Sequence, residues 1–283
     1  MPELPEVETV RRLIEPHVVG HAITGIEIHD FPAVLETNLP ADPASLLLGR
    51  TLVGARRRGK YLQFPLDDGN TMVVHLRMTG RLLVMERDAE PVRFEHAVLH
   101  LSSGEDLRFA DQRKFGRISI FTAEDIERLE HRLGPEPLSD TLTVDVLERA
   151  LHRRTGSIKG ALLDQGMIAG LGNIYVDESL WATRIHPLTP ANQLDRAEIE
   201  ALIEVIRTTM RTAIDNQGTT FSSFENPYGE AGGNARYLKV YGRTKGTNAC
   251  ERCGTPIERL VVAGRGSAIC PTCQIAPTGL PAR

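Results

Sequence analysis

The cysteines carry the clearest chemical pattern in the chain. Cys250 and Cys253 form one C-x2-C pair, and Cys270 and Cys273 form a second pair after sixteen intervening residues. Two such pairs can place four thiolates tetrahedrally around one Zn²⁺, and the chain has no other cysteine. Disulfides are the weaker alternative, because we expect a cytoplasmic protein. We therefore predict one structural zinc that stabilises a short C-terminal segment.

A glycine-rich turn in MIAGLGNIYVDESLW is the second pattern. Gly170, Gly172 and Asn173 predict a tight turn between two helices, with Asn173 as the cap of the second helix. Backbone N–H groups at the start of a helix are good phosphate anchors. A well-capped helical hairpin without any ligand explains the same residues. The dinucleotide-binding fingerprint is excluded, because its last glycine is missing and a helix precedes the turn.

Cations and large apolar residues lie close together in RRRGKYLQF, HLRMTG and DQRKFG. Lys60 stands between a glycine and a tyrosine, which predicts a defined position, although a cation run beside a strand is usually a solvated edge. Met78 and Phe115 would ordinarily belong to a core. Arg113 and Phe115 at one loop tip could instead form a wedge that enters a base stack.

The N-terminal stretch MPELPEVETVRR holds three glutamates and two prolines in its first ten residues, and no cation. Pro5 fits the first turn of a helix, where its missing N–H costs nothing. Pro16 is expected to end that helix. The apolar residues at helical spacing are Val7, Val10 and Ile14. A helix of this kind leaves Pro2 and Glu3 unexplained.

Three regions must position these residues. Residues 21–122 contain short apolar stretches separated by turn signals, which indicates a β-sandwich or barrel. Residues 124–216 have apolar positions at helical spacing. Residues 218–235 are rich in Gly, Ser and Asn and predict a mobile loop or linker. Beyond it, RYLKVYGR predicts a strand, and the last ten residues predict a disordered tail.

Composition places the chain among soluble globular proteins of about two domains, with 283 residues, 41% hydrophobic and 25% charged. It shows no membrane-length apolar run and no secretory signal, so we expect a cytoplasmic protein. The net charge of −4 argues against a nucleic-acid partner. However, residues 50–62 hold five cations and no acid, and residues 234–273 hold seven cations and two acids. A basic face is therefore compatible with the acidic total.

Taken together, the motifs resemble the bacterial formamidopyrimidine-DNA glycosylase family. The resemblance covers nearly the whole chain through PELPEVE, RRRGKYL, HLRMTG, DQRKFGR, LGPEPL, GLGNIYVDESL, VYGR and the four cysteines. It implies an α+β multidomain fold with an N-terminal β-sandwich, a helix–two-turns–helix domain and a zinc finger. The expected division is a catalytic domain at 1–122, the helical domain at 123–217, a lesion-capping loop at 218–235, the zinc finger at 236–274 and a tail at 275–283.

The resemblance also implies a base-excision repair enzyme that removes 8-oxoguanine and formamidopyrimidines from duplex DNA and then cuts the backbone. Removal of Met1 would leave Pro2 with a free secondary amine, whose pKa of about 7.7–8.0 leaves far more of it neutral than a lysine. Attack on the deoxyribose C1′ gives an iminium that favours β-elimination. Glu3 can exchange protons at the sugar or the departing base.

Further roles follow position by position from the resemblance. Lys60 aligns with the lysine on the lesion-side phosphate, and Arg265 aligns with the zinc-finger arginine assigned to δ-elimination. The positions that fill the gap left by a flipped nucleotide are Met78, Arg113 and Phe115. Other DNA-contact positions are Asn173, Arg154, His96 and Glu6, the last of which would hold the N-terminus near the flipped base. Some relatives have histidine where this chain has Phe94.

Two alternatives remain open at this stage. An endonuclease VIII-like glycosylase for oxidised pyrimidines would share Pro2, Glu3, the lysine and the zinc finger, but Leu4 favours the purine branch. A non-catalytic zinc-ribbon DNA-binding protein would explain the C-terminal half alone. We expect duplex DNA as the partner of a monomer in the bacterial cytoplasm, associated with the nucleoid through DNA and with no membrane contact.

Overall fold

The computed structural model describes residues 1–221, 224–244 and 248–277. The chain forms two compact units. Unit 1 consists of Met1–His131 and Ala213–Ala235, and unit 2 consists of Arg132–Thr212 and Arg236–Arg283. Both units therefore contain segments from distant parts of the sequence. None of the described helices is long and apolar enough to cross a membrane.

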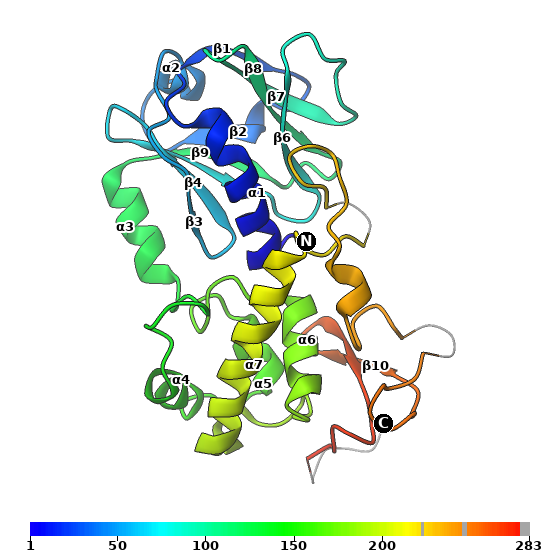
Figure 1. Cartoon of the computed structure of the whole chain (residues 1–283). Helices are drawn as coiled ribbons and strands as arrows, with labels where there is room; N and C mark the ends of the chain where they lie inside the picture. Colours follow the sequence, from blue (N-terminus) through cyan, green and yellow to red (C-terminus); the bar gives the residue numbers. More distant parts are fainter. Residues whose placement is uncertain (222–223, 245–247, 278–283) are drawn as a thin grey trace. The chain divides into compact units, whose positions relative to one another are not determined.

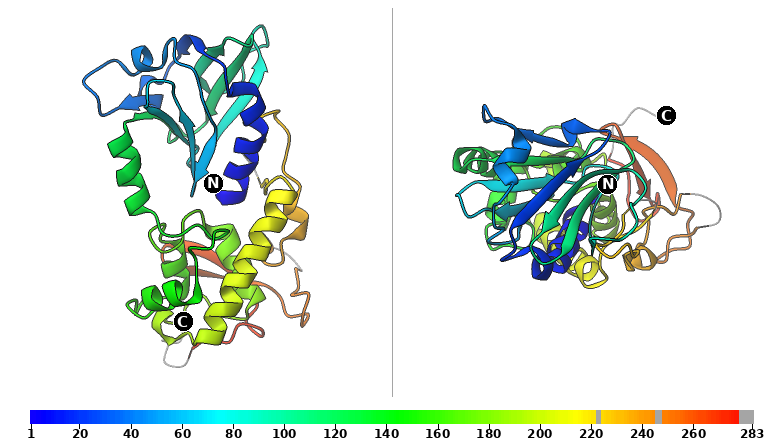
Figure 2. Two further views of the ribbon diagram at one scale, coloured as in Figure 1. Left: turned by 60° about the vertical axis from the view of Figure 1, so that its left-hand side comes forward. Right: turned by 90° about the horizontal axis from the view of Figure 1, so that it is seen from above.

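Unit 1 is built on two sheets (Figures 1 and 2). The four-stranded sheet has the order β1 (Ile23–Ile28), β7 (Glu95–Leu101), β8 (Glu105–Asp111) and β6 (Gly80–Glu86). The five-stranded sheet has the order β2 (Leu35–Thr37), β9 (Arg117–Phe121), β5 (Thr71–His75), β4 (Tyr61–Pro65) and β3 (Arg56–Arg58). Side chains from both sheets share one apolar core, which includes Phe64 and Phe109. The β-rich region and the sandwich predicted from the sequence are confirmed.

Helix α1 (Leu4–Val18) runs alongside the strands and packs against β3, β4 and β6 (Figures 1 and 2). Pro5 lies in its first turn, as predicted. The prediction that Pro16 ends the helix is wrong, because the helix continues to Val18. Pro16 lies in the last turn, where it removes a single helical hydrogen bond, and Val18 beyond it is buried in the core. Burial of that turn offsets the lost bond.

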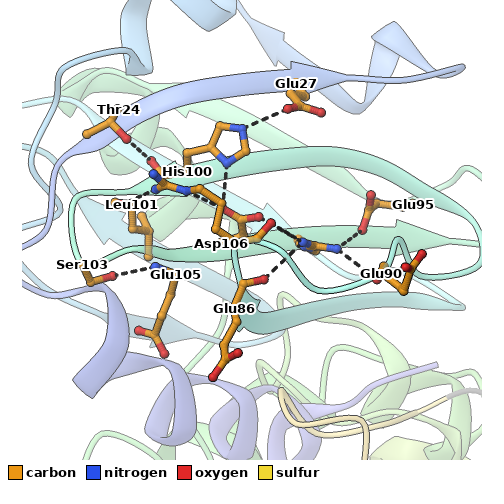
Figure 3. A network of polar contacts seen from close by, with 12 residues as sticks. Thr24, Glu27, Glu86, Glu90, Glu95, His100, Leu101, Ser103, Glu105 and Asp106 are labelled. Carbon is orange, nitrogen blue, oxygen red and sulfur yellow. Dashed lines mark hydrogen bonds and ion pairs between the residues drawn. The ribbon is translucent and has the colours of Figure 1, made fainter.

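A network of charged side chains covers part of the four-stranded sheet (Figure 3). The Asp106 carboxylate, only 1% exposed, bonds to His100 Nδ1 at 2.7 Å and accepts from Arg108 Nη2 at 3.1 Å. His100 Nε2 lies 3.0 Å from a Glu27 oxygen, and Arg108 pairs with Glu95 at 3.5 Å. These contacts join β1, β7 and β8 across the sheet.

Shorter elements complete unit 1. The 3-10 turn η1 (Pro32–Val34) precedes β2, and helix α2 (Pro43–Leu47) follows β2. Helix α3 (Ala123–Arg132) follows β9. The start of α3 is held by Asp125, whose carboxylate accepts from the Thr122 backbone N–H at 3.1 Å and its hydroxyl at 3.0 Å.

Unit 2 combines helices with one hairpin. Its helices are α4 (Val144–Leu151), α5 (Ile158–Leu163), α6 (Asn173–Ala182) and α7 (Arg196–Asp215), together with a 3-10 turn η2 (Ala191–Gln193). The residues of α7 from Ala213 on are counted with unit 1. The hairpin joins β10 (Glu258–Val262) to β11 (Arg265–Ile269), and β11 packs against α6. The helical region predicted for residues 124–216 is confirmed.

The strand predicted for RYLKVYGR is wrong. The 3-10 turn η3 (Asn234–Tyr237) overlaps its start, and residues 236–243 form no strand. The Glu178 carboxylate accepts the backbone N–H groups of Lys239, Val240 and Tyr241 at 2.8, 2.9 and 2.8 Å. Because these three donors are bound to one side chain of α6, they are not available to a neighbouring strand.

The described parts of the 218–235 loop are anchored rather than loose. Phe224 is buried in the core of unit 1, and the Pro227 carbonyl accepts the Val84 N–H of edge strand β6 at 3.1 Å. Residues 222–223 of this loop lie outside the described residues, as do residues 278–283 of the expected tail. Gln274 is 1% exposed and donates to the Ile185 carbonyl at 2.9 Å.

Candidate functional site

Two buried carboxylates surround the start of α1. Glu3 is 2% exposed and Glu6 is 1% exposed, and Pro2 beside them is also buried. The Glu6 carboxylate accepts the backbone N–H of Glu3 and that of Thr219, each at 2.8 Å. Gly218 permits this approach, because its φ is +80° and an added Cβ would lie 3.0 Å from Glu6 Cγ. Glu6 thus joins the N-terminus to the loop that follows α7.

The terminal amine lies in the same environment. Burial is the main cause that lowers the pKa of the Met1 amine from its ordinary value of 8.0. The charges of Glu3 and Glu6 oppose this shift, whereas those of Lys60 and Arg113 add to it. A larger fraction of such an amine is neutral near pH 7 than of an exposed one. The structure therefore brings together an amine, two carboxylates and two cations that the sequence separates.

Lys60 occupies a defined position at the turn between β3 and β4, with 6% of it exposed. Arg57 holds this turn by donating to the Gly59 carbonyl at 3.0 Å, and it pairs with Glu8 of α1 at 3.1 Å. Arg58 pairs with Glu130 at 2.5 Å. For Arg57 and Arg58, the explanation of the cation run as a solvated edge is wrong, because both guanidinium groups are committed to carboxylates.

His75 is a neighbour of this site that we did not identify from the sequence. It pairs across the sheet with Tyr61, and the two rings pack edge to face with centroids 4.5 Å apart. Burial, with the charges of Arg77 and Lys60, lowers the pKa of His75 to about 3, so the ring is neutral at physiological pH. His75 is the first residue of the HLRMTG motif, and this place in the sequence was the available signal.

Two loops of unit 1 carry the predicted wedge residues. Phe115 is 49% exposed, and the Arg113 guanidinium lies 4.6 Å from the centroid of its ring. Met78 on the other loop is half-buried. The alternative that Phe115 belongs to the core is therefore wrong, and the pair forms an exposed cation–π tip.

His96 lies inside unit 1 with 2% exposure. Its Nδ1 is 2.8 Å from an Asp30 oxygen, and its Nε2 is 2.8 Å from the Asp111 carbonyl. Both ring nitrogens are occupied, so His96 supports the Asp111 backbone from within. A direct contact of His96 with DNA stays a prediction.

In unit 2, the prediction that Asn173 caps α6 is wrong. Gly172 is the N-cap residue, and Asn173 is the first residue of the helix. The Asn173 amide instead donates to the Gly266 carbonyl of β11 at 2.9 Å. Gly170 has a φ of +90°, which confirms the tight turn. Asn173 and Gly266 line one surface pocket together with Tyr241 and Arg259.

Arg265 begins β11 and is exposed to solvent. The next two residues of β11 are bound by the buried Lys159. Its ammonium donates to the Gly266 carbonyl at 2.9 Å and to the Ser267 hydroxyl at 2.5 Å. Lys159 also pairs with Asp177 at 2.7 Å, and both residues are at most 2% exposed. We did not identify this pair from the sequence, because a lysine among helical apolar positions has no distinctive spacing. Arg154, by contrast, is exposed and pairs with Asp164 at 2.6 Å.

The four cysteines converge at one point of unit 2. Their sulfur atoms all lie within 4.8 Å of one another. Individual Sγ–Sγ distances are 3.9 Å for Cys250–Cys273, 3.4 Å for Cys253–Cys270 and 3.6 Å for Cys253–Cys273. A tetrahedral zinc with Zn–S bonds of about 2.3 Å requires sulfur separations of about 3.8 Å. The four thiols fit a zinc ion, and among the described residues they form the one group found at such distances.

Comparison with known proteins matches the parts of the chain in order. Residues 1–118 match the formamidopyrimidine-DNA glycosylase N-terminal domain, and residues 133–225 match its H2TH domain. Residues 248–275 match a zinc finger found in FPG and IleRS. The matched segments together cover more than half of the chain.

Whole proteins are similar over nearly their full length. Formamidopyrimidine-DNA glycosylase of Herpetosiphon aurantiacus is 46% identical over 97% of this chain and 100% of its own length. The Chloroflexus aurantiacus enzyme is 44% identical over 97% of this chain and 98% of its own length. A crystal structure of a Lactococcus lactis FPG mutant with DNA containing Fapy-dG has a TM-score of 0.87 and 37% identity, with 97% of this chain and 100% of that chain covered.

The sandwich, the helical domain and the zinc finger define a DNA-repair glycosylase. The chain belongs to the formamidopyrimidine-DNA glycosylase family, an enzyme family of glycosylase/AP lyases.

Proposed function

We propose that this enzyme excises oxidised purines, namely 8-oxoguanine and formamidopyrimidines, from duplex DNA and then cleaves the backbone by β,δ-elimination. The observation that carries the proposal is the burial of Pro2, Glu3 and Glu6 together at the start of the chain. Desolvation there lowers the pKa of the terminal amine. The Lactococcus lactis relative has been solved with DNA containing Fapy-dG and with DNA containing an AP site. These complexes support a lesion of the same class here.

The reaction begins after Met1 is removed, so that Pro2 carries the terminal amine in the same buried surroundings. The neutral Pro2 nitrogen attacks the deoxyribose C1′, and the bond from C1′ to the base breaks as the base leaves with a proton. The Pro2 nitrogen then loses its own proton, and the C1′–O4′ bond of the sugar ring breaks as O4′ takes up a proton, which leaves a C1′=N iminium. This iminium has no N–H proton to lose, so its positive charge persists. This charge acidifies the C2′ hydrogen, and β-elimination releases the 3′ strand.

The acid–base work falls to Glu3, whose carboxyl is buried one residue from the nucleophile. Lys60 holds the lesion-side phosphate and assists elimination. The effect of its charge on the pKa of the terminal amine supports this role, because it places the ammonium near the reacting nitrogen. Arg265 grips phosphate from the start of β11 and serves δ-elimination. Asn173 contacts backbone phosphate beside it.

Recognition requires the damaged nucleotide to leave the stack, which costs a few kcal/mol and least at damaged pairs. Met78, Arg113 and Phe115 fill the gap that remains. Exposure of the Phe115 ring and the Arg113 guanidinium supports this role. Glu6 holds the N-terminus beside the loop that faces the flipped base, and Arg154 adds a DNA contact.

One structural zinc is held by Cys250, Cys253, Cys270 and Cys273. When bound, the ion crosslinks the two C-x2-C pairs and stabilises the hairpin that carries Arg265. We further propose that the enzyme acts as a monomer on nucleoid DNA in the bacterial cytoplasm.

A glycosylase assay tests the substrate class. Matched duplexes would carry 8-oxoguanine opposite cytosine or thymine glycol opposite adenine, and release of each base would be measured under single-turnover conditions. We expect faster release of 8-oxoguanine. Preference for thymine glycol would instead indicate an endonuclease VIII-like enzyme for oxidised pyrimidines.

A further inference from the structure

The carboxylate of Asp111 receives hydrogen bonds from two separate loops. Asp111 ends strand β8 and is 1% exposed. Its Oδ1 accepts the Arg113 backbone N–H at 3.0 Å and the Thr79 hydroxyl. Its Oδ2 accepts the backbone N–H groups of Phe115 and Gly116 at 2.8 and 2.7 Å. Four donors on one buried carboxylate leave it no direct access to a ligand.

The two loops are those that carry the proposed gap-filling side chains. The Met78 loop comprises residues 76–79 between β5 and β6, and the Phe115 loop comprises residues 112–116 between β8 and β9. Each contains one non-glycine residue in the left-handed region, Arg77 at a φ of +52° and Lys114 at +55°. Such a conformation is unfavourable for residues with a Cβ and persists only where neighbouring contacts enforce it. Bonds to Asp111 supply such contacts on both loops.

The backbone around Asp111 is held from the other side as well. His96 Nε2 lies 2.8 Å from the Asp111 carbonyl. Lys114 Nζ pairs with Asp30 at 2.7 Å, and Asp30 also bonds to His96. An added Cβ on Gly116 would lie 2.5 Å from the Phe109 ring, so the loop closes tightly on the core. The position of the carboxylate is therefore set by the sandwich rather than by the loops.

We propose that Asp111 is a positioning residue that locks the Met78 loop and the Phe115 loop into one arrangement before DNA binds. This inference rests on the proposed gap-filling role of the three side chains. Loops ordered in advance do not have to be ordered while the nucleotide leaves the stack, which lowers the cost of flipping. The Thr79 hydroxyl couples the two loops. It donates a hydrogen bond to the Asp111 carboxylate, and its oxygen accepts one from the Arg113 backbone N–H at 3.3 Å.

Asp111→Asn tests the proposal with little change of shape. The amide of Asn has one oxygen that accepts hydrogen bonds. Its NH2 group can only donate, so it cannot accept hydrogen bonds from the backbone N–H groups around it. We expect excision of 8-oxoguanine opposite cytosine to slow by about tenfold or more, the effect of losing a hydrogen bond to a charged group. Cleavage at a preformed abasic site in an unpaired bulge should slow by less than about threefold, because little flipping is then required.

Asp125→Asn is the matched control. Asp125 is a buried carboxylate of the same unit that also accepts a backbone N–H and a hydroxyl, but it bonds to neither loop. We expect this variant to lower the stability of the fold without changing the ratio of the two rates. A ratio in Asp111→Asn equal to that of the wild type would overturn the proposal. If Asp111→Asn does not fold, Thr79→Val decides the same question by the same ratio.

A failure of the proposed function can be distinguished from a failure of the proposed role of Asp111. A wild-type enzyme that excises no oxidised purine contradicts that function and not the role of Asp111 in the loops. Amide hydrogen exchange at Arg113, Phe115 and Gly116 then tests the role directly. The proposal requires faster exchange in Asp111→Asn than in Asp125→Asn, and equal exchange would contradict it.

Discussion

At the scale of single residues, burial lowers the pKa of the terminal amine most, and the charges around it adjust this pKa further. Lys60 lowers the pKa of this amine, whereas Glu3 and Glu6 raise it. In the proposed mechanism the amine must be neutral to attack, so we expect the rate of adduct formation to rise as pH increases through the pKa of the amine. The charged groups that contribute to this pKa come from the N-cap and first turn of α1, the β3–β4 turn and the Phe115 loop.

Lys60→Gln should move the acid limb of the pH–rate profile to higher pH. Loss of the lysine charge removes one cause that lowers the pKa of the amine, so less of it is neutral at a given pH. Single-turnover formation of the reduced adduct, measured from pH 5 to 9, provides the profile. A limb that stays in place or moves to lower pH would contradict the proposed environment.

At the scale of elements, His100 links strands β1, β7 and β8 through Glu27 and Asp106 (Figure 3). Its hydrogen bond to Asp106 is the main cause that raises the pKa of His100, and Glu27 adds to it. The raised pKa means that the protonated ring stabilises the fold fully below the unfolded value near 6.5. This contribution is lost as pH rises through the folded pKa. Arg87 and Arg108 lie beside Asp106, and the His29 ring lies beside Glu27.

His100→Gln should therefore cost more stability at pH 5.5 than at pH 8.5. Urea unfolding of both proteins at each pH gives the difference in free energy of unfolding. The wild-type advantage should shrink as pH rises, because the ring loses its proton in the folded protein. An advantage that grows with pH would show that the ring is neutral in the network.

The Lys159–Asp177 pair joins α5 and α6 to β11. Lys159→Met should cost about 3–5 kcal/mol, because it leaves Asp177 buried without its partner. Burial already raises the pKa of Asp177 to about 6, so we expect Asp177 to be protonated at neutral pH in this variant. Lys159→Met/Asp177→Leu should recover most of the loss. Thermal unfolding and zinc retention are the measurements, and additive losses in the double variant would contradict the pairing.

The sequence predicted whether most segments are helices or strands, but not the tertiary contacts that decide where they begin and end. Apolar residues repeat regularly in the strands and in α7, so the sandwich and the helical region could be recognised. RYLKVYGR has the composition of a strand, but Glu178 from a distant helix captures its N–H groups. Asn173 is a good cap by residue type, yet Gly172 takes that place and frees the amide for Gly266. Such outcomes depend on tertiary partners that local patterns do not contain.

At the scale of the whole molecule, the basic segments are less positive than their composition indicates. Arg57 and Arg58 pair with acids of unit 1, and Lys239 pairs with Glu251 in unit 2. The candidate site could be predicted residue by residue only through the family resemblance. Asp111 and His75 stand inside the motifs DQRKFG and HLRMTG, but the motifs alone gave neither a role, and Lys159 belongs to no motif. Each of the three acts through neighbours that only the fold brings to it.

Arg154→Ala should reduce the salt dependence of DNA binding. If its exposed guanidinium contacts a phosphate, the slope of log K against log salt should fall by about 1. Arg196→Ala is the control, because Arg196 of unit 2 is also exposed and paired with acids, Asp145 and Glu148, as Arg154 is with Asp164, but it is not a predicted DNA contact. Fluorescence anisotropy between 50 and 200 mM salt measures both slopes. Equal slopes for the two variants would remove Arg154 from the interface.

The central claim is that the Pro2 nitrogen is the nucleophile, and borohydride trapping tests it most directly. The enzyme without Met1 is incubated with duplex DNA containing 8-oxoguanine, reduced, digested and mapped by mass spectrometry. We predict an adduct on the N-terminal Pro2 peptide, and no adduct in protein that retains Met1, because the Pro2 nitrogen is then an amide. An adduct on Lys60, or equal trapping when Met1 is retained, would contradict the account.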